Sequence, residues 1–306
     1  MALRHCFHGR IASPATLGNG VALVSTMLWA SSFPATEYLL GAWDPLSLGV
    51  ARLAGAALFL VTLTLATGRG AVVAGAPWRD VLLIGGLGVA APVFLIVFGQ
   101  AYSDAVTVAI IGTSLPLVAA GMAWILDGRR PGAMVVLGSV LAVIGGCLAA
   151  LAGVGGPEGP RGGEILVLGA MITWIWYSRA SLQRLASLGD LALSSLTFAA
   201  GALVAASLVG LVLLLGGFTP RIALDGPHLA ALLWMSMLAI GLSVPLWFTA
   251  ARLLGLTVAA IHTNLAPFYV MLIALAFGGS VNGQQVLGAV LVALGALLAQ
   301  LAAARR

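Results

Sequence analysis

Apolar residues run through this chain in long blocks, and short breaks that contain charged residues, Gly or Pro separate the blocks. A helix of about 20 apolar residues crosses the ~30 Å hydrocarbon layer of a bilayer. The pattern therefore predicts an all-α integral membrane protein with ten membrane-spanning helices. We expect these spans at residues 18–40, 45–67, 80–101, 104–126, 132–152, 164–185, 190–216, 228–250, 256–278 and 283–303.

One stretch of this pattern occurs twice. When residues 107–152 are shifted forward by 150 positions without a gap, 17 of 46 positions are identical. A chain this rich in Ala, Leu, Gly and Val would give on the order of five identities by chance. A break rich in Gly and Pro divides the ten spans into two sets of five. We therefore expect an N-terminal repeat at 1–152, a linker at 153–163 and a C-terminal repeat at 164–306.

Five spans in each half have a topological consequence. Because the number is odd, the second half must enter the membrane from the opposite face. The chain is therefore predicted to form two inverted-topology five-helix repeats. Many secondary transporters use this construction to alternate access around a site near the middle of the membrane.

Composition and charge support the same class. The chain is 61% hydrophobic and 8% charged, whereas about 25% of the residues in a soluble domain are charged. Its 14 basic residues are all Arg and are scattered between apolar blocks, so we expect a lipid bilayer and no nucleic acid as partner. With both termini inside, the positive-inside rule is obeyed by eleven arginines and broken by two. The eleven are Arg4, Arg10, Arg69, Arg79, Arg129, Arg130, Arg179, Arg184, Arg252, Arg305 and Arg306, and the two are Arg161 and Arg221.

Several local motifs resemble a known family. They are WASSFPA at 29–35, the opening of the second span from Pro45 to Arg52, and the Thr/Ser/Pro run that ends at Pro116. Together with the ten-span layout, they resemble the drug/metabolite transporter (DMT) superfamily, EamA-type, over nearly all of the chain. The aromatic content near the middle of the spans is similar to that of bacterial aromatic amino-acid exporters.

The resemblance implies a function and a location. It implies a secondary transporter in the bacterial inner membrane, with both termini in the cytoplasm, that exports small metabolites by alternating access. Amino acids, above all aromatic ones, are the favoured substrates, and we expect the protein to function as a monomer. The direction of export comes from the resemblance alone, because gradients decide the net direction of an alternating-access carrier.

Polar and aromatic side chains near the middle of the spans are the candidate substrate-binding residues. Trp29 and Trp174 lie far from the membrane interfaces where aromatic belts form, so they are expected either to line a pocket or to pack between helices. An imidazole such as that of His262 is costly among apolar neighbours. It is expected to bind substrate, to carry a proton or to bond to a neighbouring helix. The candidates are Trp29, Ser32, Thr113, Trp174, Trp176, Tyr177, His262 and Asn264.

Prolines inside the spans are candidate hinges. Those in the third and fourth spans have counterparts in the eighth and ninth, so bends are predicted in matching places of the two repeats. The alternative is that Pro is simply frequent in membrane helices. The five hinge candidates are Pro34, Pro92, Pro116, Pro245 and Pro267.

One pair of opposite charges lies near the membrane. Glu37 is close to the outer end of the first span, and Arg52 lies within the second span near the same face. We predict a structural ion pair, and the alternative is that Arg52 binds a substrate carboxylate. No carboxylate lies deep in any predicted span, which makes a zwitterionic or neutral substrate easier to accommodate than a lipophilic cation.

Two other classes of function compete with amino-acid export. A multidrug or other metabolite carrier of the same superfamily is the nearer alternative. The more remote alternative is an intramembrane serine protease with Ser114 and His262 as a catalytic pair. It is remote because Gly112 and His262 are equivalent positions of the two repeats, so that repeat symmetry explains the position of His262 without a catalytic role. We expect no enzyme, cofactor or metal: Cys6 and Cys147 lack metal-ligand spacing, and a Walker motif needs a Lys that the chain does not contain.

Overall fold

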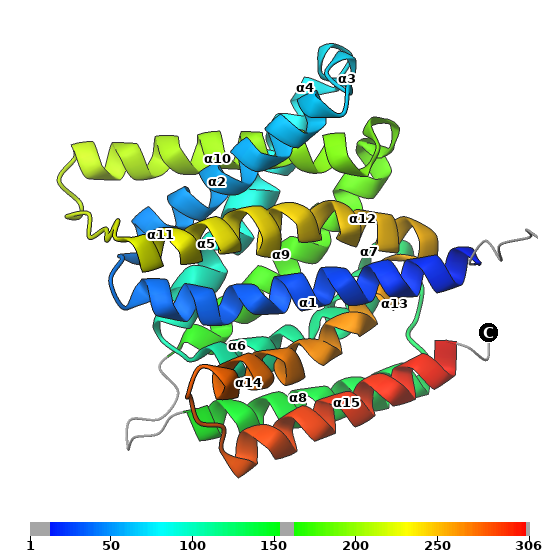
Figure 1. Cartoon of the computed structure of the whole chain (residues 1–306). Helices are drawn as coiled ribbons and strands as arrows, with labels where there is room; N and C mark the ends of the chain where they lie inside the picture. Colours follow the sequence, from blue (N-terminus) through cyan, green and yellow to red (C-terminus); the bar gives the residue numbers. More distant parts are fainter. Residues whose placement is uncertain (1–12, 154–161, 304–306) are drawn as a thin grey trace, which may run out of the picture.

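The computed structural model describes residues 13–153 and 162–303. Within these ranges the chain forms ten long helical segments and no strand (Figure 1). The first five segments are α1 (Pro14–Leu40), α2 (Pro45–Ala66), α4 with η1 and α5 (Trp78–Asp80, Val81–Gly85, Gly86–Ala101), α6 with α7 (Ala105–Gly112, Leu115–Asp127) and α8 (Ala133–Gly153). The second five are α9 (Gly163–Arg184), α10 (Asp190–Leu214), α11 with η3 and α12 (Gly226–Leu233, Trp234–Leu242, Ser243–Leu254), α13 with η4 and α14 (Leu256–Ile261, His262–Leu265, Ala266–Ala276) and α15 (Gly283–Ala303).

The all-α class and the ten helical segments predicted from the hydrophobic pattern are confirmed. Two short elements, α3 (Ala71–Ala74) and η2 (Ala186–Leu188), lie in connections. Seven of the described segments are long and apolar enough to cross a membrane by length and composition. Most of the predicted linker 153–163 lies outside the described residues, as do Arg4, Cys6, Arg10, Arg161, Arg305 and Arg306.

Capping residues set where the helices begin and end. Ser13, Asp44, Asp104 and Asp225 each accept a hydrogen bond from the backbone N–H three residues later, which satisfies one free donor at the start of a helix. Gly128 adopts a left-handed conformation with φ 69° and ends α7. These local signals fall in the breaks of the hydrophobic pattern, so both levels of the sequence place the helix ends in the same connections.

The principal helix pairings join one half of the chain to the other. Helix α1 packs on α12, α5 on α9, α2 on α10, α6 on α14 and α8 on α15. Each of the first five segments corresponds to the segment five places later in the chain. If every segment is exchanged for its counterpart, the α1–α12 pair becomes the α9–α5 pair, and each of the other three pairs stays the same. The packing therefore has the symmetry expected of two inverted repeats.

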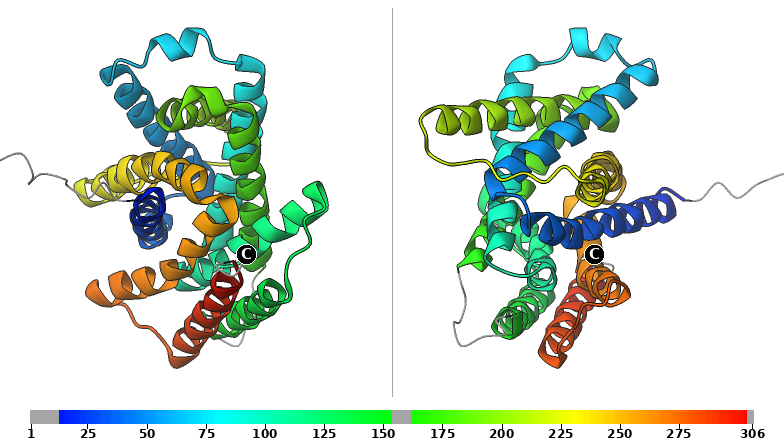
Figure 2. Two further views of the ribbon diagram at one scale, coloured as in Figure 1. Left: turned by 90° about the vertical axis from the view of Figure 1, so that its right-hand side faces the viewer. Right: turned by 60° about the vertical axis from the view of Figure 1, so that its left-hand side comes forward.

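The segments form a bundle with a helix pair on each flank. Helices α2 and α10 lie along the top of Figure 1, α8 and α15 lie along the bottom, and the other six segments lie between them (Figures 1 and 2). Helix α1 begins and α15 ends at the same end of the bundle, on the right in Figure 1. We call this end the terminal side and the opposite end the distal side.

Irregular turns occur in matching segments of the two repeats. The third and eighth segments contain the π-helical stretches η1 and η3, and the fourth and ninth are interrupted after Gly112 and at η4. Pro116 and Pro267 were expected inside continuous spans, but each is the second residue of a new half-helix. The first turn of a helix tolerates Pro because the missing N–H would have no partner there.

Candidate functional site

A cavity of about 70 Å³ lies at the centre of the bundle, between the two halves. Its lining comes from seven of the ten segments and is mostly apolar. A position shared by both repeats, at the middle of the helices, is typical of substrate sites in inverted-repeat transporters. The lining residues are Ser25, Thr26, Trp29, Arg52, Pro92, Val93, Ile96, Leu115, Ala170, Met171, Trp174, Ile240, Ser243, Val244, Trp247 and Thr263.

Three tryptophans form part of the cavity wall. Trp174 of α9 and Trp247 of α12 have ring centroids 6.3 Å apart, and the Trp247 indole N–H donates to Ser178 Oγ at 3.0 Å. On the α1 side, a Cβ added to Gly112 would lie 3.2 Å from Trp29 Cη2, so the indole rests directly over this glycine. The three indoles give the cavity flat apolar surfaces that suit an aromatic ring.

Three of the four hydroxyl groups in the cavity lining donate to the backbone. Ser25 Oγ donates to the Ser243 carbonyl at 2.8 Å, Ser243 Oγ to the Ala239 carbonyl at 2.7 Å, and Thr263 Oγ1 to the Ala260 carbonyl at 2.7 Å. Since each hydroxyl has a single proton, their oxygens are left as hydrogen-bond acceptors. These groups suit a donor on a ligand better than an anion.

Arg52 is the charged residue of the cavity lining. Its side chain is buried, with 4% of the residue exposed, and it forms no hydrogen bond or ion pair with any described residue. The predicted pair of Glu37 with Arg52 is not formed. Glu37 lies at the distal end of α1, where its carboxylate accepts the Ala105 backbone N–H at 3.3 Å.

A second pocket on the distal side contains Glu37. It has a volume of about 570 Å³ and is also lined by Asp104 and Gln285. Gln285 Nε2 donates to Asp104 Oδ1 at 3.4 Å. The start of α6 draws Glu37 to this pocket because its N–H groups favour a carboxylate. Arg52, seven residues into α2, points into the bundle instead.

The structure separates the aromatic candidates. Trp29 and Trp174 line the cavity, whereas Tyr177 and Trp176 do not. Tyr177 is fully buried behind Trp174, with ring centroids 5.2 Å apart, and its hydroxyl shares a 2.6 Å hydrogen bond with Thr197 Oγ1 of α10. Trp176 follows on α9 with 39% of its surface exposed, because consecutive helical residues point in different directions.

The polar candidates also lie outside the cavity lining. Ser32 and Thr113 are buried, and Thr113 Oγ1 donates to the Ile110 carbonyl one turn earlier. His262 is half-buried, with Nδ1 3.2 Å from the Val258 carbonyl. Asn264 is buried, and its Oδ1 has no donor among the described residues. In the two interrupted segments, Thr263 between His262 and Asn264, and Leu115 two residues after Thr113, line the cavity instead.

Sequence reasoning missed some of the lining. Thr263 lies seven residues inside its predicted span 256–278, so its depth was a signal, whereas Trp247 lies three residues from the end of span 228–250 and gave a weaker one. Ser25 and Thr26 gave no signal that distinguishes them from other small polar residues of a membrane helix. A Ser/His catalytic pair is not formed: Ser114 Oγ has no hydrogen-bond partner in the described chain, and His262 bonds to the backbone.

Polar contacts join the halves on both sides of the cavity. On the terminal side, Arg179 of α9 pairs with Asp127 of α7 at 2.8 Å, and Arg184 pairs with Asp80 of α4 at 3.2 Å. We call these two ion pairs the terminal latch. They close the bundle between its halves at the end where α1 begins.

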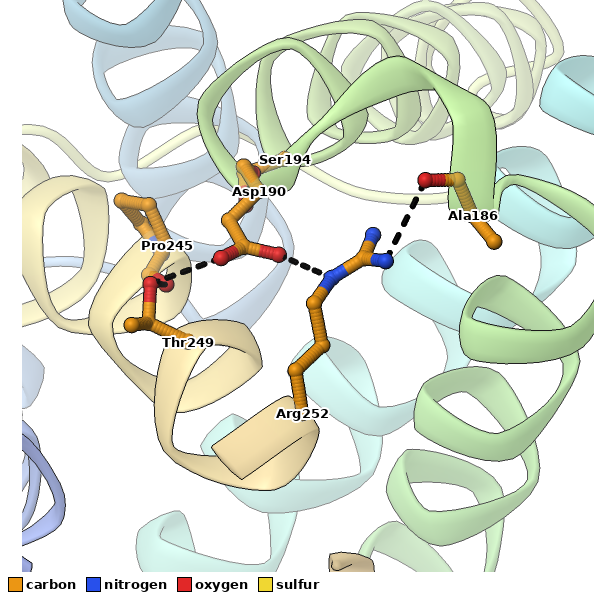
Figure 3. A network of polar contacts seen from close by, with 6 residues as sticks. All are labelled: Ala186, Asp190, Ser194, Pro245, Thr249 and Arg252. Atoms are coloured by element: carbon orange, nitrogen blue, oxygen red, sulfur yellow. Dashed lines mark hydrogen bonds and ion pairs between the residues drawn. The ribbon is translucent and has the colours of Figure 1, made fainter. Parts of the chain in front are cut away.

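A further network braces the terminal end of α12. Asp190 of α10 accepts from Thr249 Oγ1 at 2.8 Å and pairs with Arg252, which donates to the Ala186 carbonyl at 3.2 Å (Figure 3). Thr249 Oγ1 also lies 3.0 Å from the Pro245 carbonyl. Pro245 lies within the cavity-lining part of this segment, between Val244 and Trp247, and the braced end follows directly.

The distal side has its own contacts between the halves. The Asp44 carboxylate accepts the Arg221 backbone N–H at 2.8 Å, the Asp44 N–H donates to the Arg221 carbonyl at 3.0 Å, and Trp43 Nε1 donates to the Ala223 carbonyl at 2.9 Å. We call these contacts the distal latch. Contacts between the halves are therefore present at both ends of the bundle.

Comparisons with known proteins identify one family, one relative and one similar fold. A family model described as "EamA-like transporter family" matches residues 16–151 and, a second time, 161–301. The uncharacterized protein PA1977 of Pseudomonas aeruginosa is 32% identical over 219 residues, which covers 70% of this chain and 68% of that protein. A solved structure titled "Crystal structure of protein" has a TM-score of 0.70 and 19% identity, and covers 94% of this chain and 98% of the other. This last likeness is one of fold.

Proposed function

Because this chain belongs to the EamA-like transporter family, we propose that it is a secondary transporter that exports amino acids, with aromatic ones favoured, by alternating access. The chain is a multi-pass membrane protein and a transporter of the DMT superfamily. The proposal adds a substrate and a mechanism. The observation that carries it is the central cavity, which both halves build and three tryptophans line.

The volume of this cavity supports a change of conformation during transport. Pockets for small ligands have volumes of about 300–1,000 Å³, and one water occupies about 30 Å³. The cavity of about 70 Å³ is therefore too small for phenylalanine or tryptophan. Substrate enters after the two halves separate on one side, and the hinge candidates Pro34, Pro92 and Pro245 lie inside helices that would have to bend.

We further propose the orientation and the working unit. The described arginines on the terminal side outnumber those on the distal side, where Arg221 lies, so the terminal side faces the cytoplasm under the positive-inside rule. The cavity is complete within one chain, which supports a functional monomer. The repeats are 1–152 and 164–306, and each contributes to the cavity.

Transport by purified protein in liposomes tests the substrate. We expect wild-type protein to move radiolabelled phenylalanine and tryptophan faster than empty liposomes do. Trp247→Ala should lower the rate about tenfold or more, because one face of the site is lost. Trp124→Ala is the matched control, since Trp124 is 50% exposed on α7, away from the cavity. Movement of a cationic dye without movement of either amino acid would replace this proposal with the drug carrier.

The drug-carrier alternative has weaker support. A lipophilic cation needs a carboxylate or another anionic group in the site, and the charged residue of the cavity lining is Arg52. A permanent positive charge at this depth repels a cation in the same low-dielectric space. The composition of the lining therefore favours a substrate with a negative group.

A further inference from the structure

Arg52 stands out among the charged side chains because it is buried without a partner. An unpaired charge in a low-dielectric interior costs several kcal/mol, and an arginine does not escape this cost by losing its proton. Three other arginines of the described chain have carboxylate partners: Arg179 pairs with Asp127, Arg184 with Asp80 and Arg252 with Asp190. No carboxylate among the described residues pairs with Arg52, and the closest candidate from the sequence, Glu37, bonds to the start of α6.

The surroundings of Arg52 are arranged for an anion. The guanidinium borders the central cavity, where the other polar lining groups are uncharged hydroxyls. The half-helix α7 begins at Leu115, which lines the same cavity, and α6 ends at Gly112 just before it. The positive end of one helix therefore meets the negative end of the other. The net positive charge beside the cavity is that of the Arg52 guanidinium.

We propose that Arg52 binds the carboxylate of the transported substrate, so that the site recognises organic acids with a flat apolar body. This inference rests on the proposed function and narrows it. The guanidinium offers two parallel N–H donors that match the two oxygens of a carboxylate. Trp29, Trp174 and Trp247 meet the apolar body, and the free oxygens of Ser25, Ser243 and Thr263 accept from an ammonium group if the substrate carries one.

The proposal ranks three ligands that differ by one group. Phenylalanine has both charged groups, 3-phenylpropionate lacks the amine, and 2-phenylethylamine lacks the carboxylate. The carboxylate is the required group, because its partner is a full charge and the amine meets neutral hydroxyl oxygens. The two acids should therefore bind, and the amine should bind at least tenfold more weakly than either acid.

Calorimetric titration of the purified full chain in lipid discs with these three ligands tests the ranking without any need for transport. Arg52→Gln should weaken binding of both acids on the order of 30-fold or more and should not weaken binding of the amine, because the substitution removes a charge that repels the amine. Arg52→Lys should be intermediate, because it keeps the charge and loses the bidentate geometry. Arg69→Gln is the matched control, since Arg69 is exposed after the end of α2.

Thermal unfolding of the same variants separates binding from a structural role. Removal of an unpaired buried charge should leave the unfolding temperature of Arg52→Gln at or above that of the wild type. Loss of acid binding in such a variant supports the proposal. Three results overturn the proposal. Arg52→Gln still binds the acids, the wild type prefers the amine, or Arg52→Gln loses acid binding together with a lowered unfolding temperature. Failure of the amino-acid transport assay with Arg52-dependent binding intact would instead refute only the proposed export.

Discussion

Gly112 determines how far the Trp29 indole can retreat from the central cavity. The ring lies over this glycine, where even a Cβ would approach Cη2 to 3.2 Å. The side chain at position 112 therefore controls a wall of the site from behind. In the second repeat the equivalent position is His262, which is half-buried and bonded to its own turn. The two repeats use the same backbone position for different purposes.

Gly112→Val tests this control of the cavity wall. The added methyl groups should push the indole into the cavity and raise the KM for phenylalanine about tenfold, as expected for one or two methylenes of misfit in an apolar pocket. Gly121→Val is the control, because a Cβ at Gly121 meets nothing within 4 Å. Transport kinetics in liposomes measure the effect. An equal KM for the two variants would show that Trp29 is free to move elsewhere.

Asp44 gives the distal latch a dependence on pH. Burial opposes the charge of this carboxylate, but the backbone N–H groups of Ser47 and Arg221 outweigh it and hold the pKa of Asp44 below its usual value. A lowered folded-state pKa means that the stabilisation is complete above the unfolded value, about 3.9. It is lost as pH falls through the lowered value. Wild type should therefore unfold at a higher temperature than Asp44→Asn at pH 7, and the difference should shrink below pH 4. A constant difference would contradict this account.

At the scale of single helices, the α8–α15 pair depends on close approach of the backbones. A Cβ added to Gly145 of α8 would lie 2.5 Å from the Gly288 carbonyl oxygen of α15. Small residues allow such contact between membrane helices, where the hydrophobic effect gives no attraction between them. The two helices occupy one flank of the bundle (Figure 1), and none of their described side chains belongs to the central cavity lining.

Gly145→Leu should therefore lower stability rather than alter the site. Overpacking at a tight contact costs about 1–3 kcal/mol, and we expect a lower unfolding temperature in detergent for this variant. Gly20→Leu on α1 is the control, because a Cβ at Gly20 meets nothing within 4 Å. The KM for phenylalanine should stay at the wild-type value for the Gly145 variant that remains folded. A changed KM with unchanged stability would place this flank in the transport machinery.

The hydrophobic pattern was sufficient for the helices, because membrane helices are defined by length and by polar breaks. Depth along a span identified Trp29 and Trp174. It failed for Trp176 and Asn264, because depth does not tell which face of a helix meets the cavity when both faces are apolar. The Glu37–Arg52 pair failed for a related reason. Glu37 and Arg52 lie near the same membrane face, but Glu37 has another partner there, the backbone N–H at the start of α6.

At the scale of the whole molecule, two latches hold the same two halves together at opposite ends of the cavity. The terminal latch consists of side-chain ion pairs, and the distal latch consists largely of hydrogen bonds to the backbone. An inverted-repeat transporter opens one side while the other stays closed. Under the proposed alternating access, each latch would stabilise the states in which its own side is closed, and the balance between the latches would set the population of the two open states.

Weakening one latch should shift accessibility of the cavity toward that side. We expect Arg179→Gln to favour the state open on the terminal side and Asp44→Ala to favour the state open on the distal side. A cysteine at Thr26, which lines the cavity, reports this in a background without Cys6 and Cys147. Partly exposed ion pairs contribute about 1 kcal/mol or less, so labelling by a membrane-impermeant thiol reagent should change up to about fivefold. The two variants must change labelling in opposite directions when the reagent is added from one side. If both raise labelling from the same side, the latches do not oppose one another, and the halves move in another way than rocking about the central cavity.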